Sequence, residues 1–318
     1  MIYRYLCRAT LIALALAAFC ASAAVRAEGV AVAVVYPDLR DPFRTVFQEI
    51  INGIEQGFKA PVKPYVLAED AEGDAVKAQL EQDHVPIAIT LGRAGLVSAR
   101  MLSDAMPVVV GAAFISPDVE KPGMSGITLS PDPEAMLGKL KALVPDIRRV
   151  SVVYDPKRNE WEIDKARKVA KELGVQLNAL PAEDVRSAAA HYRNLLDESK
   201  DAGSAIWLLQ DNAVTDERTL LPVILKDAWD SNLVVFSSNP DHVRKGALFS
   251  MYPDNTAMGR SLGVMARNRL QNGTAKTGSI EPLRDLLLAV NIRTAEHLGL
   301  RFESQERQKF DLVFPASR

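Results

Sequence analysis

Cysteine is almost absent from this chain, and the two that it has, Cys7 and Cys20, both lie near its beginning. The chain beyond residue 20 therefore has no thiol, which excludes a disulfide or a cysteine metal site there. Histidine is also scarce, and none of the four residues has a second histidine at the helical spacing that zinc sites use. We therefore expect a fold held together by its apolar core, with no metal.

A hydrophobic run long enough to span a membrane is also missing. The apolar run over residues 9–18 is shorter than the roughly 20 residues that a spanning helix needs. It follows Arg4 and Arg8 and precedes small residues, a pattern typical of a secretory signal peptide. We expect cleavage after Ala27, with Ala23 as the alternative, and hence a periplasmic mature protein. A membrane anchor, or lipid attachment at Cys20 despite the bulky Phe19 before it, fits the pattern less well.

The chain has no strong excess of charge of either sign. Its formal net charge is −2, and the expected signal peptide carries three basic residues and no acidic one, so the mature chain is at −5. A mildly acidic surface argues against nucleic acid as a partner.

Known catalytic motifs are absent as well. No Gly-x-Ser-x-Gly elbow, phosphate-binding loop or dinucleotide fingerprint follows any predicted strand. The nearest feature is Gly92 and Arg93 with Gly95, where backbone at the start of a helix can hold an anion. An ordinary tight turn explains the two glycines equally well. We expect neither an enzyme nor a cofactor.

What the sequence does contain is a regular alternation of short β-branched runs with longer amphipathic stretches, which predicts parallel sheets with crossover helices. One series has strands at 30–36, 62–67, 87–91 and 107–112, with helices at 42–58, 75–82 and 96–105. A second series has strands at 149–154, 176–180, 205–209, 234–237 and 247–251, with helices at 160–173, 185–199 and 219–231.

Two such series predict an α/β protein with two doubly wound lobes. The Pro- and Gly-rich residues 115–133 are expected to cross between the lobes, a helix at 255–271 to return to the first, and a strand at 285–291 with a helix at 294–298 to go back to the second. The predicted domains are a signal peptide at 1–27, lobe one at 28–126 plus 252–281, and lobe two at 127–251 plus 282–318.

Ligands of doubly wound sheets bind beyond the carboxyl ends of the strands, so residues at predicted strand ends are the candidates. Asp211 can pair with a ligand ammonium and Asn212 can add a hydrogen bond, although both residue types also cap turns and helices. A carboxylate can accept from Ser237 and Ser238. The remaining candidates are strand-end residues of either lobe: Tyr36, Asp38, Tyr154 and Asp155. Of the three tryptophans, Trp161 alone is placed to reach a ligand.

Several segments carry a family resemblance. They are Gly126-Ile127-Thr128-Leu129, residues 149–156, Asp211-Asn212-Ala213-Val214, Gly246-Ala247-Leu248, residues 252–259, Ala289-Val290-Asn291 and residues 294–300. From about residue 126 onward the chain resembles the ABC-transporter substrate-binding family that includes tryptophan- and tyrosine-binding members. The resemblance implies a type I periplasmic-binding-protein fold, an amino acid ligand contacted by Asp211 and Asn212, and a membrane permease with its ATPase as partner. A monomer is expected.

Lobe one departs from the family pattern. Family members usually carry a His-Pro-Ala-Leu-like sequence after the first strand, where this chain has Asp38-Leu39-Arg40-Asp41-Pro42-Phe43. That departure favours an alternative, a ligand-sensing or envelope-complex protein of the same fold without transport. A periplasmic hydrolase using Ser237 with His242 is a third hypothesis, for which the sequence supplies no positive sign.

Overall fold

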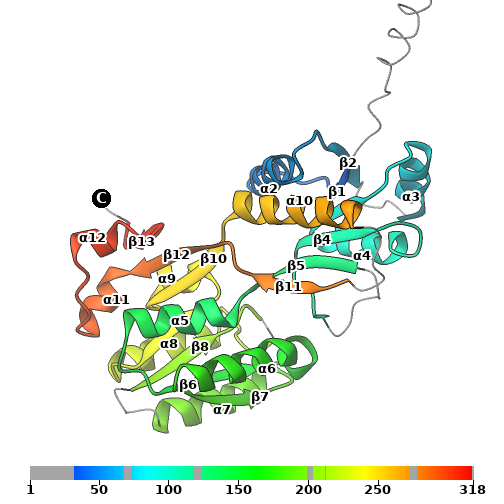
Figure 1. Ribbon diagram of the computed structural model, residues 1–318. Coiled ribbons are helices and arrows are strands. Elements are labelled where there is room, and N and C mark those ends of the chain that lie inside the picture. Colours follow the sequence, from blue (N-terminus) through cyan, green and yellow to red (C-terminus); the bar gives the residue numbers. More distant parts are fainter. Residues whose placement is uncertain are drawn as a thin grey trace, which may run out of the picture.

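The computed structural model describes residues 32–67, 73–117, 124–198, 203–211, 213–272 and 278–316. The expected signal peptide and Asn212 lie outside these residues. Two α/β lobes stand side by side in Figure 1, and the chain passes between them more than once.

Lobe one is built on a six-stranded parallel sheet in the order β11-β5-β4-β3-β1-β2. Helices α2 and α10 cover one face and α3 and α4 the other, so apolar clusters fill both sides of the sheet. The elements are β1 (Ala33–Pro37), α2 (Phe43–Phe58), β2 (Lys63–Leu67), α3 (Gly73–Gln82), β3 (Ala88–Leu91), α4 (Gly92–Leu102), β4 (Val108–Ala113), β5 (Met124–Pro131), α10 (Asn255–Gln271) and β11 (Ile280–Leu283).

Lobe two is built on a seven-stranded sheet in the order β13-β12-β10-β9-β8-β6-β7, in which only the β10–β12 pair is antiparallel. Helices α5 and α6 cover one face, and α7 and α8 cover the other. The elements are α5 (Pro133–Leu143), β6 (Arg149–Tyr154), α6 (Pro156–Glu172), β7 (Gln176–Pro181), α7 (Val185–Glu198), β8 (Ser204–Leu208), α8 (Leu220–Asp230), β9 (Val234–Ser237), α9 (Pro240–Lys245), β10 (Phe249–Pro253), β12 (Leu286–Asn291), α11 (Ile292–His297), α12 (Ser304–Arg307) and β13 (Leu312–Phe314).

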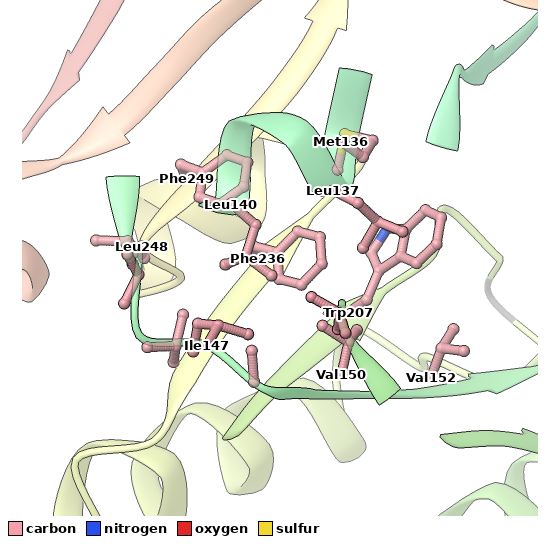
Figure 2. Packing of buried hydrophobic residues seen from close by; sticks show 14 of the residues in the cluster. Met136, Leu137, Leu140, Ile147, Val150, Val152, Trp207, Phe236, Leu248 and Phe249 are labelled. Carbon is pink, nitrogen blue, oxygen red and sulfur yellow. The ribbon is translucent and has the colours of Figure 1, made fainter. Parts of the chain in front are cut away.

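The core of lobe two contains a row of stacked aromatic rings. Figure 2 shows the Phe236 ring between those of Trp207 and Phe249, which come from the neighbouring strands β8 and β10. Ring centroids are 5.8 Å apart for Trp207 and Phe236 and 5.2 Å apart for Phe236 and Phe249. All three side chains are fully buried, so they anchor the middle of the sheet whose strand ends carry candidate residues.

Three helices of lobe two, α5, α6 and α9, begin at a repeated local motif. Asp132, Asp155 and Asn239 each accept a backbone N–H with the side chain, and proline follows in the first turn of α5, α6 and α9. An Asx cap satisfies an otherwise unpaired donor, and proline in the first turn loses no helical hydrogen bond. The chain therefore turns sharply into each helix just after the preceding strand, which is β5 of lobe one for α5, and β6 and β9 of lobe two for α6 and α9.

In lobe one, α2 and α10 pack backbone against backbone. The contact uses glycines four residues apart on both helices, Gly53 and Gly57 on α2 and Gly259 and Gly263 on α10. A Cβ atom on Gly259 would overlap the carbonyl oxygen of Ile50, and one on Gly53 would overlap that of Thr256. The close approach thus depends on the absence of side chains at these positions.

The predicted fold class, an α/β protein with two doubly wound lobes, is confirmed. The chain crosses between the lobes within residues 115–133, as predicted, but only after β5, a strand that the sequence analysis missed. A Cβ atom on Gly126 in this strand would overlap Val110 O. Strand β5 also runs across the predicted domain boundary after residue 126. Within the ranges described above, no helix has the length and apolar character needed to cross a membrane.

Candidate functional site

Two adjoining cavities are lined by residues of both lobes, at the carboxyl ends of the strands. The first, with a volume of about 330 Å³, has Asp211 in its wall and is called the Asp211 cavity. The second, of about 530 Å³, has Ser238 in its wall and is called the Ser238 cavity. Phe114 of lobe one and Gln210 of lobe two line both, so together the cavities form one cleft between the lobes.

Lobe two brings the first turns of α6 to the Asp211 cavity. Lys157, Arg158, Asn159 and Trp161 line it, together with Gln210 and Asp211 from the end of β8. Lobe one contributes Leu96 and Arg100 of α4, residues 114–116 after β4, and Ser130 of β5. The wall thus combines three cations, one carboxylate, amides, hydroxyls and two aromatic rings, which suits a small ligand that has both charged and apolar parts.

Asp211 has a buried oxygen with no partner. Its side chain is 3% exposed, and Oδ1 accepts the Ala213 N–H at 2.9 Å and lies 3.6 Å from Arg158 Nη1. The other oxygen, Oδ2, is buried and makes no hydrogen bond to any of the described residues. A buried carboxylate oxygen without a donor is costly, and Asp211 is one of the residues that line the cavity, so a ligand group that reaches it can supply the missing donor.

A second carboxyl group lies beside it. Glu162, on α6 just past the residues that line the cavity, is fully enclosed, and its Oε2 accepts from Asn159 Nδ2 at 3.3 Å. Burial raises the pKa of Glu162 to about 8. The hydrogen bond from Asn159 lowers this pKa, whereas the nearby Asp211 raises it further. Glu162 is therefore protonated at neutral pH.

Phe114 is held in the cleft by the strand beside it. It follows β4, where Ala112 has a positive φ of 53° and the register with β5 shifts. The next residue, Ile115, donates its N–H to the buried Thr128 Oγ1 at 3.0 Å. This bond fixes the segment with Phe114 48% exposed in the wall of both cavities, where a ligand can cover it.

Comparison with known proteins assigns the chain to a family. The family model described as ABC transporter substrate binding protein matches residues 75–307. The chain belongs to this family. No curated protein sequence matches this substrate-binding protein.

Solved structures share its fold. A ligand-free, open substrate binding protein with adhesive properties from Clostridium difficile is 17% identical, with a TM-score of 0.64 over 91% of this chain and 100% of that one. An ABC domain in complex with L-Trp from Streptococcus pneumonia is 17% identical, with a TM-score of 0.54 over 89% and 99%. A periplasmic ribose ABC transporter from Conexibacter woesei is 18% identical, with a TM-score of 0.51 over 88% and 98%. At these identities the likeness shows the fold alone.

Of the residues singled out in the sequence, three line the cleft, namely Asp211, Ser238 and Trp161. Asp211 lines one cavity and Ser238 the other, where Ser238 Oγ also accepts from Trp207 Nε1 at 3.4 Å. Asn212 lies outside the described residues. Trp161, the tryptophan singled out from the sequence, is in the wall of the Asp211 cavity.

The other lobe-two candidates have structural partners instead. Tyr154 is buried and its hydroxyl donates to Glu160 Oε2 at 2.9 Å, while Asp155 caps α6 by accepting the Lys157 N–H at 2.9 Å. Burial, and then the Glu160 carboxylate, raises the pKa of Tyr154. Neither residue lines the two cavities.

The lobe-one candidates also lie away from both cavities. Tyr36 packs against Phe47 with ring centroids 6.3 Å apart, and Gly92 (φ 75°) lies under the same Phe47 ring. Asp38 and Arg93 are exposed. Lobe one instead lines the cleft through residues that sequence reasoning missed, chiefly Phe114, for which the only signal was an aromatic residue just beyond a strand.

Ser237 and His242, the pair considered for a hydrolase, are in contact, contrary to our expectation. Ser237 Oγ lies 2.8 Å from His242 Nδ1, and His242 Nε2 lies 3.5 Å from Glu217 Oε1. However, Ser237 is fully buried, donates to Leu208 O at 3.2 Å and accepts the Asn239 N–H at 3.0 Å. No substrate can reach this hydroxyl, so the network serves to hold the strand end that carries Ser238.

Proposed function

We propose that the protein is a periplasmic solute-binding protein of an ABC-type uptake system, which binds a small amphoteric ligand, such as an amino acid, between its lobes. The signal peptide at residues 1–27, the permease partner, a monomeric state and the absence of catalysis are parts of this proposal. The single observation that supports ligand binding best is the buried, unpartnered Asp211 Oδ2 in the wall of a cavity formed by both lobes.

The cleft has a complementary group for each part of an amino acid. An ammonium group supplies the donor that Asp211 Oδ2 lacks. Lys157 and Arg158 supply positive charge for a carboxylate, and the Arg158 side chain, 67% exposed, lies between Asp155 and Asp211 at the cavity wall. An apolar side chain fits between Phe114 of lobe one and Trp161 of lobe two, so its burial favours closure of the lobes. L-Trp in the Streptococcus structure makes amino acids the first compounds to test.

A thermal-shift screen of the mature chain against amino acids, small peptides, nucleosides and organic anions tests the proposal. A ligand that binds the folded state alone raises the melting temperature, and saturation at 100 times Kd corresponds to about 2.7 kcal/mol. If folded, ligand-free protein shows no shift with any compound, the proposal of solute binding is wrong.

Asp211→Asn is expected to weaken binding of the ligand so found by about 10- to 100-fold, because a hydrogen bond to a charged group contributes about 1.5–3 kcal/mol. The amide keeps an oxygen to accept the Ala213 N–H and loses only the charge. Isothermal titration calorimetry measures the change. Asp227→Asn removes the same charge from α8, outside both cavities, and should bind like the unchanged protein. Equal affinities of the two variants would remove Asp211 from the site.

The alternative of a sensing or envelope-complex role has one observation in its favour. The family match begins at residue 75 and so leaves out β1 and α2, the region in which the sequence departs from the family pattern. The two roles share the ligand and differ in the partner. Capture of a permease by the ligand-bound protein supports transport, whereas capture of a receptor or an envelope protein supports sensing.

A further inference from the structure

Within the described residues, the chain passes between the lobes at three points, after β5, after β10 and after β11, and these crossings are tied to one another. The Asp132 N–H donates to Leu283 O at 2.8 Å, which joins the first crossing to the third. The Asp254 N–H donates to Asp285 O at 2.9 Å, which joins the second to the third. The crossings therefore form one connected hinge.

A buried carboxylate lies at the centre of this hinge. The Asp132 side chain is 2% exposed, and its Oδ2 accepts from Lys165 Nζ and from Arg284 Nε, both at 2.8 Å. Its Oδ1 caps α5 by accepting the Glu134 N–H at 3.0 Å. Burial alone would raise the pKa of Asp132, but the hydrogen bonds from Lys165, Glu134 and Arg284 outweigh it and hold the pKa below its ordinary value. Asp132 is thus charged and paired with two cations.

The two cations come from different parts of the molecule. Arg284 belongs to the third crossing, between β11 of lobe one and β12 of lobe two. Lys165 belongs to α6, one turn beyond Trp161 on the helix whose first turns line the Asp211 cavity. Asp132 therefore joins the hinge to the cleft-lining helix through side chains alone.

We propose that Asp132 is a positioning residue for ligand binding, which with Lys165 and Arg284 fixes the orientation of α6 relative to lobe one and so the width of the cleft. Removal of one partner of a buried ion pair leaves the other charge uncompensated, and the groups then rearrange to reach water. Because the three crossings are short and tied together, such a rearrangement changes the angle between the lobes. The effect on the orientation of the lobes does not depend on a ligand, whereas the effect on ligand affinity rests on the proposed function.

The orientation can be measured without a ligand. The mature chain has no cysteine, so single cysteines introduced at the exposed Gln79 on α3 and Glu172 on α6 can carry spin labels on the two lobes. Pulsed electron spin resonance then gives the distribution of distances between the labels. Lys165→Met removes one cation, Asp132→Asn removes the carboxylate charge but keeps an oxygen for the Glu134 N–H, and Lys165→Arg restores the pair.

Lys165→Met and Asp132→Asn are expected to shift or broaden the distance distribution, and Lys165→Arg to return it to that of the unchanged protein. Lys168→Met, an exposed position on the same helix, is the matched control and should cause no change. For a ligand found in the screen, Lys165→Met should change affinity about fivefold or more, the lower range of coupling between distant groups.

The proposal is overturned if both charge-removing variants, folded by circular dichroism, give the distribution of the control, even where their melting temperatures fall. A shifted distribution with unchanged ligand affinity also overturns it, because the cluster would then orient the lobes without positioning the site. If the distribution shifts and no ligand is found, the role of the cluster in orienting the lobes is supported, and only the proposed function is wrong.

Discussion

Gly259→Ala is expected to destabilise lobe one by about 3 kcal/mol, at the upper end of the usual cost of overpacking. The new methyl group would overlap a backbone oxygen of α2, and neither helix can yield locally because Gly53, Gly57 and Gly263 meet the partner backbone in the same way. Denaturant unfolding followed by circular dichroism, which reports both lobes, measures the loss.

The position of the tryptophans gives this experiment an internal reference. Trp161, Trp207 and Trp229 lie on α6, β8 and α8 of lobe two, so tryptophan fluorescence follows that lobe alone. Gly259→Ala should move the circular dichroism transition more than the fluorescence transition. Gly138→Ala is the control, because an added Cβ atom at this position has no atom within 4 Å. Alanine in a helix interior should increase the free energy of unfolding by up to about 1 kcal/mol relative to glycine. Equal stabilities of the two variants would contradict the assigned packing.

Glu162→Gln is expected to change how stability depends on pH. The pKa of Glu162 is about 8 in the folded protein and near 4.3 in an unfolded chain, so between these values the folded state holds one more proton. Stability from this group is therefore fully present below about pH 4 and is lost as the pH rises through 8, at up to about 1.4 kcal/mol per pH unit.

Glutamine cannot ionise, so the variant should lack this decline. Between pH 5 and pH 8 the free energy of unfolding of the unchanged protein should therefore fall further than that of the variant, by a margin on the order of 3 kcal/mol. Urea unfolding at pH 5, 6, 7 and 8 measures the difference. Glu172→Gln removes an exposed carboxylate from the end of the same helix and serves as the control. Parallel pH profiles for Glu162→Gln and the unchanged protein would show that Glu162 is ionised in the folded state.

Local signals predicted most of the fold. The helix at 255–271 has the predicted bounds, because Asp254 caps it by accepting the Ala257 N–H. Strand β5 was missed because Gly126 and the prolines around it indicated a turn. In the structure, Gly126 instead allows β5 to lie close to β4. Such an approach depends on a distant segment, which no local pattern contains.

The site was harder to predict than the fold for a related reason. Asp211 was found because it follows a buried strand, and strand ends are visible in the sequence. Which strand ends open into the cleft depends on how one lobe faces the other, and this is set by the hinge and not by any one strand. Phe114 went unnoticed because an aromatic residue beside a strand looks like core until the opposite lobe is in place.

The contact between α2 and α10 joins segments about 200 residues apart, and this separation has a consequence for the order of events during folding. Arg267 Nη1 on α10 donates to Gly57 O on α2 at 2.9 Å, and β11 must add to β5 from still further along the chain. Lobe one therefore cannot complete its core until the chain has been made as far as β11. The strands β6 to β10 of lobe two are continuous in sequence, so they can pack together before lobe one is complete, and β12 and β13 join their sheet last.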